Sequence, residues 1–208
     1  MKLVDLTITG FLDKTAGSDP VPGGGSVAAN SGATAAALAE MVANLTIGRK
    51  KYEDKEEMMK EIAAKAAEYR AQFVRDIDAD SDAYNLVFDA FKMPKETDEE
   101  KTVRSVKIQE ATKVAAEVPL GVARRAFEMM TIIDRVARNG NQNAVTDAGV
   151  AMMSARTAVF GAVLNVKINL GSLKDEEYVQ RVSAEVDRLV KEAATMEAEL
   201  LAYVNSQI

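Results

Sequence analysis

The 208-residue chain contains no cysteine and no histidine. Their absence excludes disulfide bonds, thiol nucleophiles, histidine-assisted Ser or Cys triads, and zinc sites built from Cys or His. Acid–base chemistry in this chain must therefore use Asp, Glu, Lys, Tyr, water or the substrate itself. We accordingly expect no metal and no covalently bound cofactor.

Positive charge and long apolar segments are also scarce. The chain has 26 Lys and Arg residues and 32 Asp and Glu residues, a formal net charge of -6. Non-specific binding to nucleic acid needs a basic surface, and this charge balance argues against one. The longest uncharged run, residues 20–39, contains prolines and glycines, and the most apolar stretch, residues 157–166, is too short to span a membrane. Residues 1–12 lack the pattern of a signal peptide. We expect a cytoplasmic protein that binds neither nucleic acid nor membrane.

Proline is the third scarce residue, with four in the chain, and strong helix formers fill the stretches between them. No alternating strand pattern bounded by turn dipeptides occurs. The sequence therefore predicts an all-α fold, a compact bundle of long helices that forms a single domain over residues 1–208. The expected helices cover residues 6–15, 26–47, 54–91, 98–117, 120–138, 147–170 and 175–204, with Pro119 separating the fourth from the fifth. The sixth is apolar almost all round, which places it at the bundle centre or in a subunit interface.

Two segments are candidates for binding an anion. The first is a proline-flanked loop that opens directly into a helix, where free amides and the positive end of the helix dipole attract negative charge: Gly23, Gly24, Gly25 and Ser26. A plain turn with Ser26 as the helix cap is the alternative. The second places Arg49 and Lys50 just past a helix C-terminus. These cations either compensate the dipole or bind carboxylates of a ligand.

One carboxylate stands out by its position. Large apolar residues on the helix over 54–91 follow a regular rhythm in which position 80 is the missing member: Phe73, Ile77, Tyr84, Val87 and Phe91. Asp80 therefore points to the apolar side, where burial raises a carboxyl pKa toward a range useful for proton transfer. A structural ion pair with a neighbouring helix is the alternative. Asp78 and Asp82 share an adjacent flank of the same helix.

Several further polar residues are candidates for ligand contact. Asn165 and Asn169 lie four residues apart inside the apolar sixth helix, where buried amides need partners. They bind either a neighbouring helix or a polar ligand edge. Asp147 stands at the start of that helix and has capping as its alternative role. Lys95 follows Pro94 and is an exposed loop residue unless a ligand recruits it.

Six motifs in series resemble the cyclodeaminase/cyclohydrolase family, whose members include the C-terminal domain of formiminotransferase-cyclodeaminase. The resemblance extends from about residue 3 to about residue 205. It rests on Pro22-Gly23-Gly24-Gly25-Ser26-Val27-Ala28-Ala29, Thr46-x-Gly48-Arg49-Lys50, Asp78-Ala79-Asp80, Met93-Pro94-Lys95, Gly140-Asn141, and Val159-Phe160-Gly161-Ala162 followed by Asn165-Val166-x-Ile168-Asn169-Leu170.

The resemblance implies an all-α fold, a homodimer or larger homo-oligomer, and a tetrahydrofolate substrate, with or without a polyglutamate tail. It implies one of two reactions. We expect release of ammonia from 5-formiminotetrahydrofolate to give 5,10-methenyltetrahydrofolate. The alternative is hydrolysis of the methenyl form, and the absence of a formiminotransferase domain leaves this choice open. Asp80, Asp78 and Lys95 are the expected catalytic residues.

The expected substrate-binding residues would bind different parts of the folate. The glycine loop with Arg49 or Lys50 would hold the glutamate carboxylates, and Asn165 or Asn169 would bind the pterin edge, with Asp147 as a further candidate. A different class of function, a non-catalytic helical assembly protein, would use the same residues for packing alone. The apolar-stripe position of Asp80 favours the enzyme.

Overall fold

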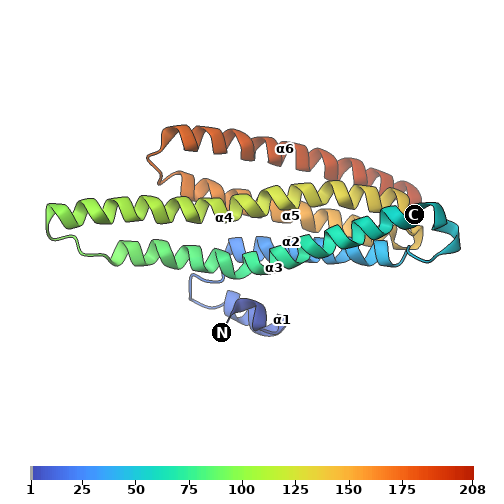
Figure 1. Ribbon diagram of the computed structural model, residues 1–208, viewed down its shortest axis with the longest axis horizontal. Helices are drawn as coiled ribbons and strands as arrows, with labels where there is room; N and C mark the ends of the chain where they lie inside the picture. The colour runs from blue at the N-terminus through green and yellow to red at the C-terminus, as the bar shows by residue number, and fades with distance from the viewer. Residues whose placement is uncertain (1) are drawn as a thin grey trace.

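The computed structural model describes residues 2–208, and within them five long α-helices form one bundle, with a short sixth helix beside it near the N-terminus (Figure 1). The helices are α1 (Ile8–Thr15), α2 (Gly24–Asn44), α3 (Glu56–Lys92), α4 (Asp98–Asn139), α5 (Val145–Leu170) and α6 (Glu176–Gln207). Short 3-10 segments cover Leu3–Asp5, Lys50–Lys55 and Gln142–Ala144. No strand occurs in this described part of the chain, so the predicted all-α fold is confirmed.

Side-chain caps fix where several helices begin. The Thr7 hydroxyl accepts from the Gly10 amide over 3.0 Å at α1, and the carboxylate of Asp175 accepts from the Tyr178 amide over 3.1 Å at α6. At α4, Thr97 and Glu100 form a reciprocal capping box. The N-cap of α2 is Gly23, which supplies no side chain. The amides that open α2 are therefore left for groups from other helices.

Small residues let α2, α4 and α5 approach one another closely at the centre of the bundle. The α2 residues that face inward are mostly alanines, and Ala29, Ala35 and Ala36 are completely buried. On α5, Ala148, Ala155 and many neighbours are equally buried between α2, α4 and α6. The sequence left this apolar helix either at the bundle centre or in a subunit interface, and the structure shows it at the centre.

The direction of the helices defines two ends of the bundle. A side chain added at Gly24, at the start of α2, would touch Asn165 near the end of α5. At the other end, the Asn141 amide donates to the Thr46 hydroxyl over 2.8 Å. Helices α2 and α5 are thus antiparallel neighbours. We call the end with Gly24 and Asn165 the glycine end, and the end with Thr46 and Asn141 the far end.

Helices α3 and α4 are longer than their neighbours and extend past the glycine end as a two-helix arm (Figure 1). The connection between them, residues 93–97, forms the tip of this arm. Several large apolar side chains on the arm are exposed, including Tyr84, Phe88 and Phe91.

The predicted break at Pro119 is wrong, because α4 continues through this proline. Proline lacks the amide that would bond to the carbonyl four residues earlier, here Ala115. The Nδ2 of Asn169, on α5, donates to the Ala115 carbonyl over 2.9 Å and replaces the missing bond. A side chain from a helix distant in sequence therefore lets one long helix form where local rules predict two.

The helical stretch Gln142–Leu170 is long and apolar enough to cross a membrane by length and composition alone. Half of its most apolar window is buried against the other helices. Its position at the core of the bundle accounts for the buried half, whereas Leu164 and Ile168 on the other face are exposed.

Candidate active site at the glycine end

Asp80 lies on α3 and faces the first turn of α2. Its Oδ2 is 3.2 Å from the Oγ of Ser26, and the Ser26 backbone amide also donates to this carboxyl group. The buried Ser26 hydroxyl has a shorter contact, 2.8 Å, to the backbone carbonyl of Ile77. One hydroxyl hydrogen serves one acceptor, so a bond to Ile77 leaves the Ser26 Oγ able to accept a hydrogen bond from a protonated Asp80. These contacts thus accommodate both protonation states of Asp80.

The electrostatics of Asp80 suit proton transfer. Burial raises the pKa of the Asp80 carboxyl, and the hydrogen bonds from the Ser26 hydroxyl and amide offset only part of that rise. No cation is among the causes of the pKa shift, and Asp80 takes part in no ion pair within residues 2–208. The ion pair that the sequence left open is therefore replaced by contacts with the first turn of α2.

The glycines at the start of α2 create the space for these contacts. A Cβ at Gly25 would lie 1.9 Å from Oδ1 of Asp80, far inside any permissible contact, whereas a Cβ at Gly24 would lie 3.3 Å from Nδ2 of Asn165. Among residues 2–208 only Gly48 has a positive φ. Gly25 is thus required for close approach by a carboxylate and not for a left-handed backbone.

Asn165 and Asn169 differ in how many of their side-chain hydrogen-bonding groups are free to bind a ligand. Asn169 donates to the carbonyls of Ala115 and Asn165, so both of its N–H groups are used. Asn165 donates one N–H to the Gly161 carbonyl over 2.9 Å. Within residues 2–208 its side chain makes no other hydrogen bond as donor, and its Oδ1 accepts none. Asn165, beside Gly24, is the one of the pair with capacity for a ligand.

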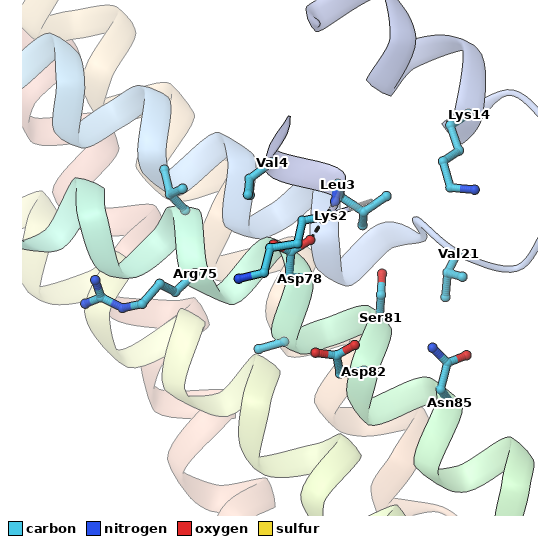
Figure 2. Close-up of a pocket in the computed structure, with 12 residues that line it drawn as sticks. Lys2, Leu3, Val4, Lys14, Val21, Arg75, Asp78, Ser81, Asp82 and Asn85 are labelled. Atoms are coloured by element: carbon cyan, nitrogen blue, oxygen red, sulfur yellow. Dashed lines mark hydrogen bonds between the residues drawn. The ribbon is translucent and has the colours of Figure 1, made fainter. Parts of the chain in front are cut away.

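A cavity of about 600 Å³ lies on one side of α3, between this helix and the N-terminal segment (Figure 2). The Leu3 amide donates to Oδ1 of Asp78 over 2.7 Å at its wall. Asp82 and Arg75 also face this cavity. Ser81 lines it as well, and its Oγ lies 3.4 Å from that of Ser26. The cavity is therefore adjacent to the contact between Ser26 and Asp80.

A second cavity of about 600 Å³ lies between α3 and α4, and Ala79 lines both. Its lining includes a partly buried ion pair, in which Arg125 donates to Asp76 over 2.5 Å, and Gln72 adds a bond of 3.0 Å to the same carboxylate. The Nε of Arg125 is buried without a hydrogen-bond partner in the described residues. Sequence reasoning missed this pair, because Asp76 lies off the apolar stripe and Arg125 is 49 residues away.

The remaining predicted site residues lie elsewhere. Arg49 and Lys50 are exposed and lie at the far end, beside a cavity of about 650 Å³ that glutamates also line. Asp147, in the first turn of α5, is at the same end. Lys95 is exposed at the tip of the arm. The structure thus brings together the glycine loop, Asp80 and Asn165, and it places these four residues apart from them within one chain.

Comparison with known proteins gives the family. The family model described as formiminotransferase-cyclodeaminase matches residues 7–188. The chain is 42% identical to the methenyltetrahydrofolate cyclohydrolase of Methylorubrum extorquens over 97% of both chains. It is 34% identical to the mouse formimidoyltransferase-cyclodeaminase over 96% of its own length but only 37% of that protein. A solved structure of a Thermotoga maritima formiminotetrahydrofolate cyclodeaminase matches with a TM-score of 0.80 and 30% identity, covering 97% of this chain and 95% of the other.

Fold and site together define an all-helical protein with a partly buried carboxyl group beside a glycine-rich helix start. The chain belongs to the formiminotransferase-cyclodeaminase family, as the matched motifs indicated. Its similar proteins carry the names of enzymes that act on folates.

Proposed function

We propose that this protein is a methenyltetrahydrofolate cyclohydrolase, which converts 5,10-methenyltetrahydrofolate and water to 10-formyltetrahydrofolate. The observation that carries the proposal is the match to the Methylorubrum cyclohydrolase, at 42% identity over 97% of each chain. The mouse bifunctional relative is less similar and much longer. The cyclohydrolase alternative is thus better supported than the cyclodeaminase expected from the sequence.

The Asp80 carboxyl group and its contacts with Ser26 support this chemistry without histidine or metal. The substrate carries a cationic carbon between N5 and N10, which an adjacent carboxylate stabilises. The Asp80 carboxylate takes a proton from water as the water oxygen bonds to that carbon. The C–N5 bond then breaks as N5 gains a proton and the new hydroxyl loses one, giving the N10-formyl group, and one proton is released overall. A raised pKa makes Asp80 a stronger base than an ordinary aspartate.

The cyclodeaminase is the second candidate, and the Thermotoga structure favours it. That protein has nearly the same length as this chain and carries the cyclodeaminase name. The same group would protonate the departing nitrogen as N10 attacks the formimino carbon, so Asp80 would act as the acid.

Absorbance of 5,10-methenyltetrahydrofolate distinguishes the two reactions. We expect the purified protein to accelerate loss of supplied methenyl absorbance above the rate without protein. Appearance of the same absorbance from 5-formiminotetrahydrofolate, without accelerated hydrolysis, would identify the cyclodeaminase instead. Asp89→Asn is the matched control for variants of Asp80, because Asp89 is exposed on the same helix. A protein that acts on neither folate contradicts the proposal.

Further properties belong to the same proposal. We infer a cytoplasmic enzyme that works as a homo-oligomer and uses neither a metal nor a covalently bound cofactor. The lack of His and Cys supports the absence of a metal, and within residues 2–208 no three acidic side chains gather in a metal-binding arrangement. Equilibrium dialysis followed by metal analysis of the active protein tests this point.

A further inference from the structure

Three residues on α3 form a row along one face of the helix, and the row begins at Asp80. Asp80, Tyr84 and Phe88 are four residues apart, so their side chains follow one another turn by turn. The rings of Tyr84 and Phe88 are stacked, with their centroids 6.3 Å apart and their planes 17° from parallel. A continuous aromatic surface therefore starts one turn beyond the carboxyl group that the proposed reaction uses.

The face of α3 that carries this row changes from buried to exposed at Asp80. On the two preceding turns, Phe73 and Ile77 are 0% and 6% exposed, whereas Tyr84 and Phe88 are 40% and 48% exposed. The change coincides with the start of α2, whose first turn contacts Asp80. Because α3 continues past this point into the arm, α2 covers the row before Asp80 and not after it (Figure 1).

The two exposed rings differ in what already contacts them. A contiguous exposed patch of aromatic side chains is typical of an interaction site, and aromatic residues commonly line small-molecule sites. The Lys92 ammonium lies 3.9 Å from the centre of the Phe88 ring. Within residues 2–208 no cation lies over the Tyr84 ring. Tyr84, the ring nearer to Asp80, is therefore the one that a flat ligand can stack against.

The spacing of the row fits a folate. From Asp80 to Tyr84 the helix rises about 6 Å, at 1.5 Å per residue. In a folate the p-aminobenzoyl ring is bonded to N10, and N10 is bonded to the one-carbon unit. At about 1.4 Å per bond, the ring centre is about 4 Å from that carbon. A carboxylate that contacts the carbon and an aromatic side chain that contacts the benzoyl ring therefore need a separation of this order.

A cation lies further out along the same face of the arm. Arg104, on α4, donates from Nε and Nη2 to the Phe91 carbonyl over 3.3 and 3.0 Å, and its guanidinium lies 5.5 Å from the centre of the Phe91 ring. Within residues 2–208 Arg104 takes part in no ion pair. Phe91 is about 17 Å beyond Asp80 along α3. A ligand tail that extends outward from Tyr84 therefore runs toward a guanidinium that is held in place and can bind a carboxylate.

We propose that Tyr84, supported by Phe88, stacks against the p-aminobenzoyl ring of the folate whose one-carbon unit lies at Asp80, and that the glutamate tail follows the arm toward Arg104. The assignment rests on the proposed function. It holds for either of the two folate reactions, because both substrates carry this ring. Tyr84 takes no part in the bond-making steps; it positions the substrate so that the one-carbon unit stays beside Asp80.

Substitutions of Tyr84 test the ring contact. Tyr84→Phe keeps the ring, and Tyr84→Leu keeps an apolar side chain without one. We expect Tyr84→Leu to raise the KM for 5,10-methenyltetrahydrofolate by about 2–10-fold, the range for loss of an aromatic pair, with a much smaller change in kcat. Tyr84→Phe should keep both constants. Leu86→Ala is the matched control, because Leu86 is also exposed on the arm but lies on another face of α3, where it lines a cavity with α4.

Tryptophan fluorescence tests the same contact without turnover. The chain has no tryptophan, so Tyr84→Trp and Leu86→Trp each introduce a single fluorophore. The probe is 5-formyltetrahydrofolate, which carries the same rings but neither of the reacting one-carbon groups. We expect it to quench Tyr84→Trp in a saturable manner, and to reduce the signal of Leu86→Trp only by absorbing light. Thermal unfolding shows whether each variant is folded, and Phe88→Trp replaces Tyr84→Trp if the larger ring prevents folding.

The outcomes separate this proposal from the proposed function. A KM for Tyr84→Leu equal to that of the wild-type protein, or equal quenching of both tryptophans, overturns the ring contact. A smaller oligomer for Tyr84→Leu by light scattering, with KM unchanged, identifies the aromatic surface as a contact between copies instead. Wild-type turnover without saturable quenching of Tyr84→Trp contradicts the ring contact alone. Saturable quenching without turnover of either folate contradicts the proposed function and leaves the ring contact standing.

Discussion

Gly25→Ala perturbs the contact on which the candidate site depends. The new Cβ would lie 1.9 Å from Oδ1 of Asp80, and real Cβ contacts essentially never fall below 3.0 Å, so the carboxylate must retreat by at least 1.1 Å. Overpacking of this kind costs about 1–3 kcal/mol. At about 2–4 °C per kcal/mol for a chain of this size, the melting temperature should fall by roughly 2–12 °C. A displacement of about 1 Å at a reacting group should lower turnover by about 10²-fold.

Gly24→Ala is the matched control one residue earlier on the same helix. Its Cβ would meet the Nδ2 of Asn165 at 3.3 Å, which a shift of a few tenths of an ångström relieves. Alanine also favours the helix over glycine by about 0.5–1 kcal/mol. The melting temperature is therefore expected to stay the same or rise. Thermal unfolding and methenyltetrahydrofolate turnover are measured on both variants.

The double variant Gly25→Ala, Asp80→Ala decides whether Asp80 causes the loss. Truncating Asp80 removes the atoms that clash, so Gly25→Ala should cost much less stability in that background, with a coupling energy of about 0.5–3 kcal/mol. If Gly25→Ala costs the same with and without Asp80, the close contact is not responsible and the reasoning fails.

Three further predictions concern Asp80 and the hydrogen bond from Asn169 that keeps α4 continuous at Pro119. Because the pKa of folded Asp80 is raised, its contribution to stability grows as pH falls through the folded pKa, so Asp80→Asn should not lower the melting temperature at pH 7; a clear loss would indicate a structural role. The hydrolytic kcat/KM should fall on acidification with a midpoint above 3.8, the value of an ordinary Asp, and a pH profile without this limb contradicts a base of raised pKa. Asn169→Ala leaves the Ala115 carbonyl without its donor and should cost about 1–3 kcal/mol by denaturant unfolding. The cost should shrink when Pro119→Ala restores the helical amide, and an equal cost in both backgrounds would refute this compensation.

The sequence was sufficient where local periodicity decides the structure. Helical spacing predicted the long helices and the inward direction of Asp80, and it left α5 either at the bundle centre or in a subunit interface. It was insufficient at Pro119, because the bond that keeps α4 continuous comes from Asn169, which is 54 residues from Ala115. Local rules contain no information about a donor on a distant helix.

The candidate site was predictable only in part for the same reason. The glycine run indicated close backbone approach, but what approaches Gly25 is Asp80, 55 positions further on. Arg49 and Lys50 were grouped with the glycine loop as anion-binding residues, yet α2 separates them by its whole length. A sequence motif groups residues by type and order, whereas the three-dimensional structure shows which of them lie close together in one chain.

Turnover of 5,10-methenyltetrahydrofolate by Asp80→Asn tests the central claim most directly. The substitution keeps the size of the side chain and removes its charge and its capacity to take a proton. The account predicts that kcat falls by about 10²–10⁴-fold with a much smaller change in KM, while the exposed control Asp89→Asn keeps wild-type turnover. A folded Asp80→Asn protein with wild-type kcat would contradict it.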